Sequence, residues 1–296
     1  MIEEATSSKH SGTTDAPLVS VVAPCFNAEK YLEEALRSIY EQDYPNFEVI
    51  IVDDGSTDNS YAMLEQLQKV HGFQLYRQQN QGVSAALNFG LRHARGDYVA
   101  TPDLDDIMLP HSLSVRAAYL DQHSEVGCVG ALVIYIDSEG QETKRQNGKL
   151  DFDYLLGNAY VCGAPVSLYR MEALRAAGFY DPEIKVQDFQ MTLRIASQGY
   201  QIHKLPVLVT RYRRHPDNLS RRYKVLLDAD LRTIEPYQSH PAYERGRTEL
   251  VNKALKYAVV ADKRHAWQLL RSLPLRQWNR TTFRRLKRFL LHHETT

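Results

Sequence analysis

Short runs of apolar residues alternate with segments of helical periodicity along the first half of the chain. The apolar run at 18–23 predicts a buried strand, and apolar residues then recur every three or four positions from 31 to 39, as expected for an amphipathic helix. A second apolar run, at 47–52, predicts another buried strand. Asn27, between the first strand and the helix, is the expected N-cap. Strand, helix and strand in this order are typical of a parallel sheet with right-handed crossovers.

The same alternation continues to residue 122. Five further elements are predicted there, namely helices at 60–70, 84–94 and 111–122 and strands at 73–77 and 98–101. We therefore expect an α/β fold built on an open, doubly wound, mostly parallel sheet flanked by helices. In such folds the ligands bind at the carboxyl ends of the strands.

Beyond residue 122 the regular alternation gives way to a mixture of elements. The pattern predicts strands at 126–137 and 207–212, a loop at 144–150 and helices at 171–177 and 189–196. From about residue 224 the periodicity is helical to the end of the chain. A helical extension is therefore expected after the α/β part.

The composition is that of an ordinary globular protein. With 296 residues, 43% of them hydrophobic, the chain is long enough to bury a sizeable core without disulfides. The 36 basic and 36 acidic side chains balance, which argues against a nucleic-acid partner. The three cysteines are odd in number and widely spaced, which favours a reducing compartment. Residues 1–16 lack the apolar core of a signal peptide, and no apolar stretch is long enough to span a bilayer, so a cytoplasmic location is expected.

Charge is distributed unevenly at the C-terminal end. Residues 264–293 include eight Lys or Arg and no Asp or Glu. Phe283, Leu286, Phe289 and Leu290 share one face of a predicted helix, with basic residues around the remainder. This pattern favours an interfacial helix that binds an anionic membrane surface, on the inner face of the cell membrane. The alternative is a helix docked on the rest of the protein, with its arginines merely solvated.

Two acidic loops follow predicted strands. Asp103, Asp105 and Asp106 repel one another, and a hard cation such as Mg²⁺ or Mn²⁺ relieves that repulsion while keeping positions open for substrate phosphates. An exposed acidic turn is the commoner explanation of such a triplet taken alone. Asp53 and Asp54 could bind a base or ribose, or could serve only the geometry of a turn.

Four motifs, in this order and spacing, resemble glycosyltransferase family 2 of the GT-A fold. They are VSVVAPCFN at 19–27, VDDGSTD at 52–58, GDY at 96–98 and DLDD at 103–106 followed by Pro110. The resemblance implies an inverting enzyme that moves a sugar from a nucleotide diphosphate, by default UDP, to an acceptor hydroxyl. The acceptor it implies is a saccharide or lipid-linked saccharide of a bacterial cell-surface polysaccharide or lipopolysaccharide.

The resemblance also implies a donor site and a metal site. Two more segments contribute to them: NQGVSAALN at 80–88, beside the nucleotide sugar, and YRRHPDNLS at 212–220, suited to gripping a diphosphate. The donor-binding residues it implies are Pro24, Phe26, Asn27, Asp53, Asp54, Asn80, Asp103, Arg213, Arg214, His215 and Ser220. The ligands it implies for Mn²⁺ or Mg²⁺ are Asp103, Asp105 and His215, with Asp105 as the principal one.

The catalytic base follows from the same resemblance. Asp188 matches the Asp of the family's E-D-x-x-x-x-x-R segment, although Gln187 stands where the family usually has Glu. From the residues alone, a carboxylate favoured by a helix N-terminus is the preferred explanation of Asp188. Tyr160 and Tyr180 fall where the family shapes its acceptor site, and each could stack on a sugar ring or simply pack.

These motifs suggest a division of the chain and leave other functions to weigh. We expect a polar leader at 1–17, a catalytic domain at 18–222 and a helical region at 223–296. Within the catalytic domain, the nucleotide-sugar half ends near residue 110 and the acceptor half follows. A non-catalytic protein that binds nucleotide sugars or glycans on the same scaffold is the main alternative. A sugar nucleotidyltransferase and a dinucleotide oxidoreductase rank lower, because their Gly-rich loops are absent after the first strand.

Overall fold

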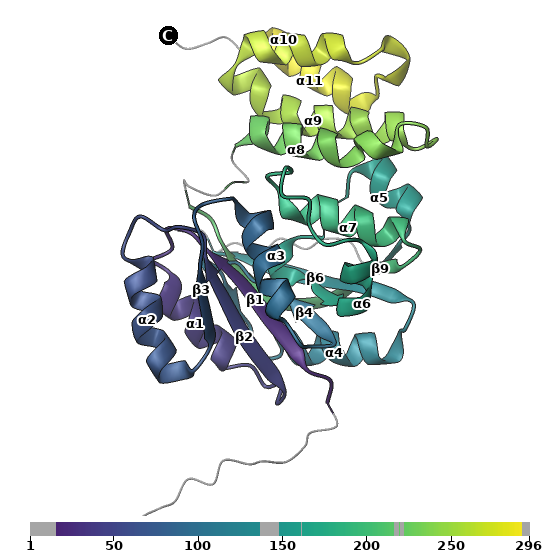
Figure 1. Cartoon of the computed structure of the whole chain (residues 1–296). Coiled ribbons are helices and arrows are strands. Elements are labelled where there is room, and N and C mark those ends of the chain that lie inside the picture. The colour runs from purple at the N-terminus through teal and green to yellow at the C-terminus, as the bar shows by residue number, and fades with distance from the viewer. Residues whose placement is uncertain (1–15, 137–147, 161, 216–218, 220–221, 292–296) are drawn as a thin grey trace, which may run out of the picture.

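The computed structural model describes residues 16–136, 148–160, 162–215, 219 and 222–291. Its centre is a twisted mixed sheet (Figure 1). One half consists of four parallel strands, in the order β3 (Gln74–Arg77), β2 (Phe47–Asp53), β1 (Val19–Cys25) and β4 (Tyr98–Ala100). The other half continues from β4 through β8 (Leu168–Arg170), β6 (Val126–Ile136), β9 (Gln201–Arg213) and β5 (Ile107–Met108), with β7 (Gly148–Leu150) paired to β9.

Strand direction differs between the two halves. The predicted parallel order holds for the first half, where short crossover helices return the chain to the same edge. In the second half, β8 runs antiparallel to both β4 and β6, while β6 and β9 are parallel. The carboxyl ends of β1, β2 and β4 therefore share one edge.

Helices cover both faces of the sheet. Successive residues of β1 face opposite sides, so that Val21 and Val22 belong to different hydrophobic clusters. One face is covered by α1 (Leu32–Tyr40), α2 (Ser60–His71) and α4 (Ser112–Gln122), and the other by α3 (Val83–His93), α6 (Met171–Ala176) and α7 (Gln187–Ser197). The predicted open α/β sheet flanked by helices is confirmed, and the central strand β1 is buried on both faces.

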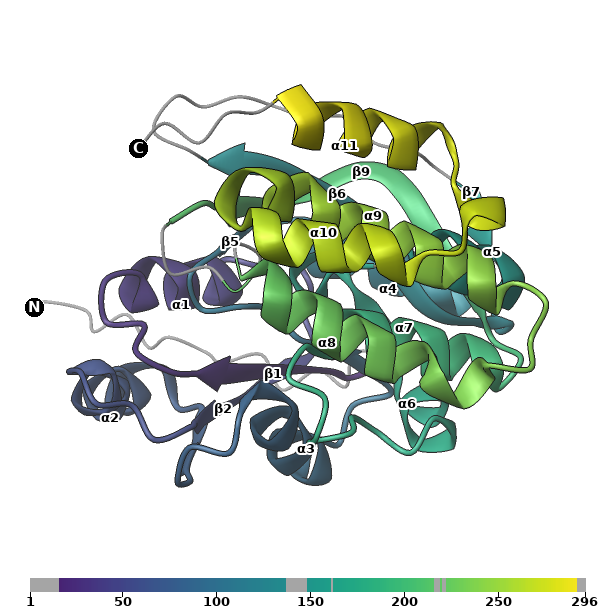
Figure 2. The same ribbon diagram turned by 90° about the horizontal axis from the view of Figure 1, so that it is seen from above.

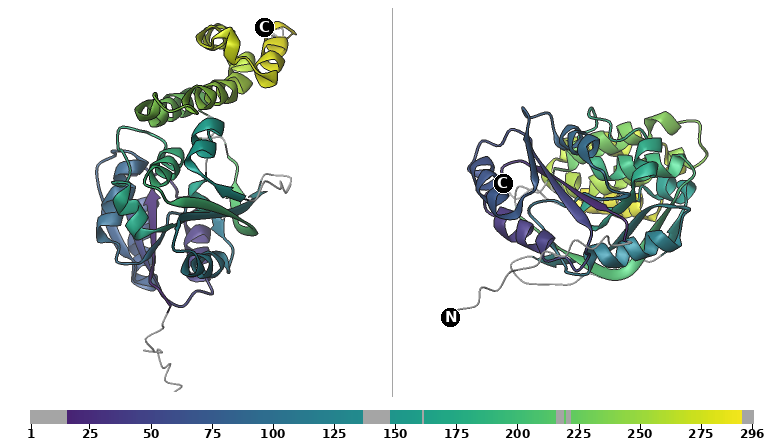
Figure 3. Two further views of the ribbon diagram at one scale, coloured as in Figure 1. Left: turned by 90° about the vertical axis from the view of Figure 1, so that its right-hand side faces the viewer. Right: turned by 60° about the horizontal axis from the view of Figure 1, so that its bottom comes forward.

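The C-terminal helices form a layer over one end of this α/β part (Figures 1 and 3). The layer consists of α8 (Tyr223–Ile234), α9 (Tyr243–Ala261), α10 (Lys263–Ser272) and α11 (Arg280–Leu291). It rests on α5 (Phe152–Asn158) and α7, and one hydrophobic cluster includes Leu155, Phe189 and Leu255. Gly246 of α9 lies so close to α5 that a Cβ there would be 2.1 Å from the carbonyl oxygen of Leu156. No described helix has the length and apolar character needed to cross a membrane.

Three predictions about local structure were wrong. Asn27 is not an N-cap, because α1 begins at Leu32 and Asn27 itself adopts a left-handed conformation with φ of 53°. Residues 148–150, expected in a loop, form β7. The strand expected at 207–212 begins six residues earlier, at Gln201.

Candidate active site

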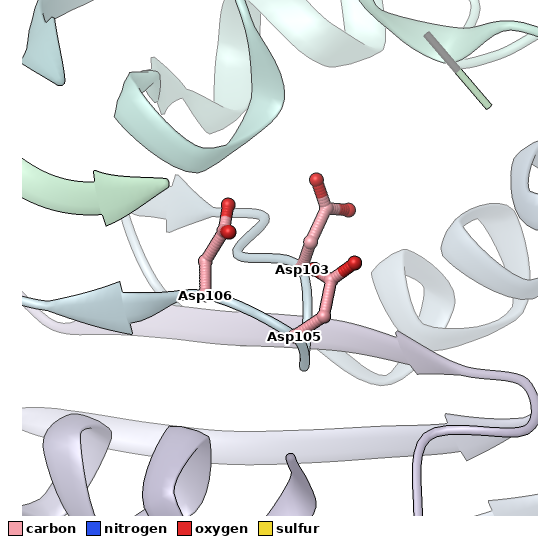
Figure 4. Close-up of side chains that lie close together, drawn as sticks. All are labelled: Asp103, Asp105 and Asp106. Atoms are coloured by element: carbon pink, nitrogen blue, oxygen red, sulfur yellow. The ribbon is translucent and has the colours of Figure 1, made fainter. Parts of the chain in front are cut away.

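The loop between β4 and β5 carries a compact group of carboxylates. Figure 4 shows the side chains of Asp103, Asp105 and Asp106 close together, and a ligand oxygen of each lies within 4.8 Å of the others. Because the loop follows β4, the cluster sits at the carboxyl edge of the parallel strands, where α/β sheets bind their ligands. Asp106 thus joins the two carboxylates that the sequence motif singled out.

The cluster holds more negative charge than its surroundings can stabilise. Burial raises the pKa of Asp103 well above its usual value, and Asp105, Asp106 and Asp188 raise it further. Burial and Asp105 raise the pKa of Asp106 to about 8, although the backbone N–H of Arg213 donates a 2.8 Å hydrogen bond to its Oδ1. The Oδ2 atom of Asp106 is buried with no hydrogen-bond partner. Carboxylate oxygens gathered in this way are the hard ligands that Mg²⁺ and Mn²⁺ prefer.

The end of β9 meets this loop across the sheet edge. The Nε2 atom of His215 lies 2.9 Å from Oδ2 of Asp105, although the two residues are 110 positions apart. The Nε–H group of Arg213 donates to the carbonyl oxygen of Asp105 over 2.9 Å, and its Nη2 to Glu34 over 2.5 Å. The structure thus brings His215 to the principal metal ligand that the motifs implied.

The two neighbouring arginines are already engaged with the protein. The side chain of Arg213 donates hydrogen bonds to the carbonyl oxygen of Asp105 and to the carboxylate of Glu34. Arg213 therefore connects α1, the acidic loop and β9. The guanidinium of Arg214 lies over the ring of Tyr135, 3.8 Å from its centroid. Ser220, the last residue implied for the donor site, lies outside the described residues.

The loop after β2 separates the roles of its two aspartates. Asp54 accepts hydrogen bonds from the backbone N–H groups of Gln81 (2.9 Å) and Gly82 (2.8 Å) and from the side chain of Gln78 (2.8 Å). Asp53 is fully buried; its Oδ2 pairs with Nε of Arg77 at 3.2 Å, and its Oδ1 has no hydrogen-bond partner. Asp54 therefore holds the loop together, and Asp53 keeps an oxygen for an incoming N–H or O–H group.

The segment after β1 builds the other wall of this loop. Asn27 accepts from the backbone N–H of Thr57 over 2.8 Å and donates its own backbone N–H to Ser56 Oγ over 3.0 Å, so it positions the loop. Phe26 is 50% exposed, which leaves its ring free to cover a base. Pro24 pairs with Val52 in the β1–β2 ladder.

Asn80 reaches the same region from the loop before α3. Its backbone lies against Gly55, where a Cβ would come within 2.8 Å of the Asn80 nitrogen. Gly55 also has φ of +73°, a conformation that favours glycine. Asn80 itself is exposed, so its side chain is accessible to a ligand.

Asp188 stands near the start of α7. Its Oδ1 accepts a hydrogen bond from the backbone N–H of Ala164 over 3.1 Å. Burial raises the pKa of Asp188 to about 7; the Ala164 hydrogen bond opposes this rise and Asp230 adds to it. Because Asp188 also raises the pKa of Asp103, the candidate base and the acidic loop lie within electrostatic range of each other.

Asp230 of α8 was not predicted from the sequence. Burial raises its pKa to about 7, and Lys253 of α9 opposes that rise. Asp230 lies on the inner side of α8, between the buried positions Leu227 and Ile234. An acidic residue at helical spacing among buried positions was the available signal, but no motif marks it.

The two tyrosines implied for the acceptor site are placed differently. Tyr180 is 3% exposed and packs within the main hydrophobic cluster, which favours packing over stacking on a sugar. Tyr160 is half-buried, with the ring of Tyr154 6.1 Å away and the ammonium of Lys204 5.8 Å from its ring centroid. The position of Tyr160 is compatible both with stacking on a sugar ring and with simple packing.

Fold and site together define a transferase of the GT-A class, because acidic loops at the carboxyl edge of the sheet face a carboxylate at the start of α7. The sequence model for glycosyl transferase family 2 matches residues 20–178, more than half of the chain, so the chain belongs to that family. It is a glycosyltransferase. The predicted family, fold and enzyme class are confirmed, and the nucleotidyltransferase and oxidoreductase alternatives fall away.

Curated relatives agree with this assignment. The chain is 27% identical over 212 residues to the glycosyltransferase EpsE of Bacillus subtilis, covering 70% of this chain and 76% of EpsE. It is 29% identical over 220 residues to the amylovoran biosynthesis glycosyltransferase AmsE of Erwinia amylovora, covering 69% and 79%. The aligned share extends past the family model and into the second half of the chain.

Solved structures share the fold. Residues 1–349 of TarS from S. aureus, in complex with UDP-GlcNAc, superpose with a TM-score of 0.67 at 19% identity, covering 88% of this chain and 82% of that one. The mannosyltransferase PcManGT from Pyrobaculum calidifontis, in complex with GDP-Man and Mn²⁺, superposes with a TM-score of 0.59 at 22% identity, covering 94% and 87%. At this level of identity the likeness supports the fold alone.

Proposed function

We propose that the chain is a metal-dependent, inverting glycosyltransferase that moves a sugar from a UDP-sugar to a hydroxyl of a saccharide or lipid-linked saccharide of the cell envelope. The observation that carries this proposal is the cluster of Asp103, Asp105 and Asp106, with His215 against it and Asp188 in electrostatic range. Amylovoran biosynthesis, named for the relative AmsE, supports a role in polysaccharide synthesis.

The donor would lie along the carboxyl edge of the parallel strands. The free Oδ1 of Asp53 suits the N–H of a base, and the exposed ring of Phe26 can cover it. Uracil offers such an N–H, and UDP-GlcNAc in TarS supports UDP over GDP. Asn80 would contact the nucleotide sugar from the loop before α3.

Asp105 and His215 would hold the metal ion, with Asp103 or Asp106 completing the protein ligands. Their oxygen and imidazole donors suit Mn²⁺, and PcManGT was solved with that ion. A divalent ion there supplies positive charge for the departing diphosphate. Arg213 holds the acidic loop against β9, so the ligands are positioned before the donor arrives.

Asp188 would be the base. The acceptor hydroxyl attacks the anomeric carbon, its oxygen–carbon bond forms as the bond from that carbon to the diphosphate oxygen breaks, and its proton passes to Asp188. The nucleoside diphosphate leaves with the electron pair of the broken bond. The hydrogen bond from Ala164 fixes Oδ1 of Asp188, which leaves Oδ2 for the proton. A single displacement of this kind inverts the anomeric centre.

A donor screen tests the proposal. The full chain would be incubated with UDP- and GDP-sugars, with Mn²⁺ or with a chelator, and the released nucleoside diphosphate measured. We expect metal-dependent release from a UDP-sugar. Asp188→Asn should bind the donor normally and lose transfer by at least about a hundredfold, the lower end of the usual contribution of a general base. The matched control is Asp228→Asn, which changes an exposed aspartate on α8.

Two results would contradict the proposal. Equal donor binding and turnover in the presence of chelator would show that the reaction does not need a metal ion. Near-normal transfer by Asp188→Asn would show that Asp188 is not the base. A non-catalytic binding protein would bind the donor without releasing any nucleoside diphosphate.

A further inference from the structure

The outermost helices, α10 and α11, carry a surface that the glycosyltransfer site does not use. They lie on the far side of α8 and α9 from the sheet (Figures 1 and 2). Five large apolar side chains there are 49–78% exposed: Trp267, Leu275, Phe283, Leu290 and Leu291. Such residues, exposed together at one end of a molecule, indicate an interaction site rather than ordinary surface.

The helix α11 both docks on the protein and keeps a free face. Thr282 is fully buried and its Oγ1 accepts a 3.0 Å hydrogen bond from Asn252 of α9, while Leu286 and Phe289 pack against the main hydrophobic cluster. Phe283 and Leu290, seven positions apart, lie together on the adjacent side of the helix, which is exposed. The sequence left open whether this helix binds a membrane or docks on the protein. Docking explains the buried side of α11 but not its exposed side.

Basic side chains border the exposed apolar ones. Arg284, Lys287 and Arg288 are all exposed, and with Leu291 they line a shallow hollow. The Nε atom of the neighbouring Arg285 is buried with no hydrogen-bond partner. Burial lowers the pKa of Arg285, and repulsion from Arg284 and Arg288 lowers it further. With no acidic residue between 264 and 293, this positive charge has no partner within its own segment.

We infer that the face formed by Trp267, Phe283, Leu290, Arg284, Lys287 and Arg288, called here the α10–α11 face, binds the surface of an anionic lipid bilayer. Apolar side chains can enter the boundary between headgroups and acyl chains, while arginines and lysines bind lipid phosphates. Trp267 stacks on Phe289 with a centroid distance of 6.0 Å, so its ring links the exposed residues of the two helices. A second copy of this chain fits poorly, because two such basic faces repel each other.

The position of this face gives the enzyme a defined orientation. The helices α8 and α9 separate the α10–α11 face from the carboxyl edge of the sheet (Figure 3). Binding of the α10–α11 face to a bilayer would hold the carboxyl edge of the sheet towards the lipid, on the far side of the C-terminal helices. Lipid-linked saccharides present their sugars at such a membrane surface. This orientation rests on the proposed function, whereas lipid binding itself does not.

Vesicle flotation of the full chain tests the inference. We expect flotation with vesicles of phosphatidylcholine and phosphatidylglycerol at low salt, little with phosphatidylcholine alone, and release as salt rises. The triple variant Arg284→Gln, Lys287→Gln, Arg288→Gln should bind about two orders of magnitude more weakly, since each basic residue near an anionic surface contributes about a factor of five. The pair Phe283→Ser, Leu290→Ser should also lose binding, even at low salt.

A matched control separates this face from net charge. Arg37→Gln, Lys69→Gln, Arg92→Gln removes the same charge from exposed positions on α1, α2 and α3 and should float like the parent. An equal loss in this control, or no flotation of the parent at low salt, would overturn the inference. So would full competition by inorganic phosphate, which would indicate a site for a free anion, or lipid-independent dimers that the triple variant abolishes.

The failure of this inference and that of the proposed function are distinguishable. The triple variant should keep the parent's release of nucleoside diphosphate from a soluble donor, because no residue of the α10–α11 face belongs to the site. Conversely, Asp188→Asn should float normally. A triple variant that loses both flotation and nucleotide release would contradict the separation of the two surfaces.

Discussion

The buried position of Asp188 gives glycosyl transfer a specific dependence on pH. Burial and Asp230 raise the pKa of Asp188 to about 7, and a base must be unprotonated to accept the proton of the acceptor. At a pKa of about 7, roughly one tenth of the molecules carry an ionised Asp188 at about pH 6 and roughly nine tenths at about pH 8. We therefore expect kcat/KM to rise about tenfold over that range.

Asp230→Asn is the perturbation that isolates the cause. Removing the Asp230 carboxylate removes a charge that disfavours ionised Asp188, so the pKa of Asp188 should fall and the acid limb should move to lower pH. Because Asp230 itself has a pKa of about 7, its charge acts on Asp188 mainly at and above about pH 7, so the variant's rate should reach its plateau at a lower pH than the parent's. A shift of one pH unit would correspond to about 1.4 kcal/mol of interaction between the two carboxylates.

The measurement is kcat/KM for nucleoside diphosphate release in the presence of acceptor, from about pH 5.5 to pH 8.5 at constant ionic strength. Saturating Mn²⁺ keeps the acidic loop charged, since Asp106, with a pKa of about 8, would otherwise titrate in the same range. Asp228→Asn, on the same helix but with a side chain 62% exposed and paired with Arg232, serves as control. An acid limb that stays in place in Asp230→Asn, or moves equally in the control, would refute the reasoning.

Three further predictions concern the metal, the fold and the donor. In thermal-shift assays, Mn²⁺ should raise Tm more at about pH 8 than at about pH 6, because protons on Asp103 and Asp106 compete with the ion. The variant Asp105→Asn should lose most of this Mn²⁺-dependent rise in Tm. Gly246→Ala should cost about 1–3 kcal/mol in denaturant unfolding, since its Cβ would meet Leu156, and a change below about 0.5 kcal/mol would contradict the close approach. Asp53→Asn should weaken donor binding in calorimetry while leaving Tm nearly unchanged, whereas Asp54→Ala should lower Tm; the reverse pattern would show that their roles are exchanged.

The parallel half of the sheet was predictable because its strands are buried on both faces. In β1 every position is apolar or small, and β2 holds four consecutive buried apolar residues at 49–52, so the strand signal does not depend on register. The signal failed in β9, because the predicted strand began only after Pro206, whereas β9 begins at Gln201. In the structure the β6–β9 pairing is irregular between Lys204 and Leu208, and a bulge of this kind accommodates a proline within a strand.

The acidic loop and His215 were predicted from the family resemblance, and the sheet topology explains why they meet. Residues at the carboxyl ends of strands share one sheet edge, so Asp105 and His215 meet although the pattern between them is mixed. Asp230 was not predictable in this way. It comes from a helix outside the sheet, and its approach to Asp188 depends on how α8 packs against α7, which no local pattern specifies.

The two aspartates of the loop after β2 can be told apart only in the three-dimensional structure. Asp53 and Asp54 are chemically identical neighbours, and both were open candidates for the nucleotide. The backbone N–H groups of Gln81 and Gly82 donate hydrogen bonds to Asp54, so its carboxylate stabilises the turn before α3. Asp53 ends β2 paired with Arg77 through Oδ2, and its buried Oδ1 has no hydrogen-bond partner. A buried acceptor without a donor is costly in the free protein, and an incoming base removes that cost on binding. The nucleotide contact that we propose therefore falls on Asp53, the carboxylate with an oxygen that lacks a hydrogen-bond partner.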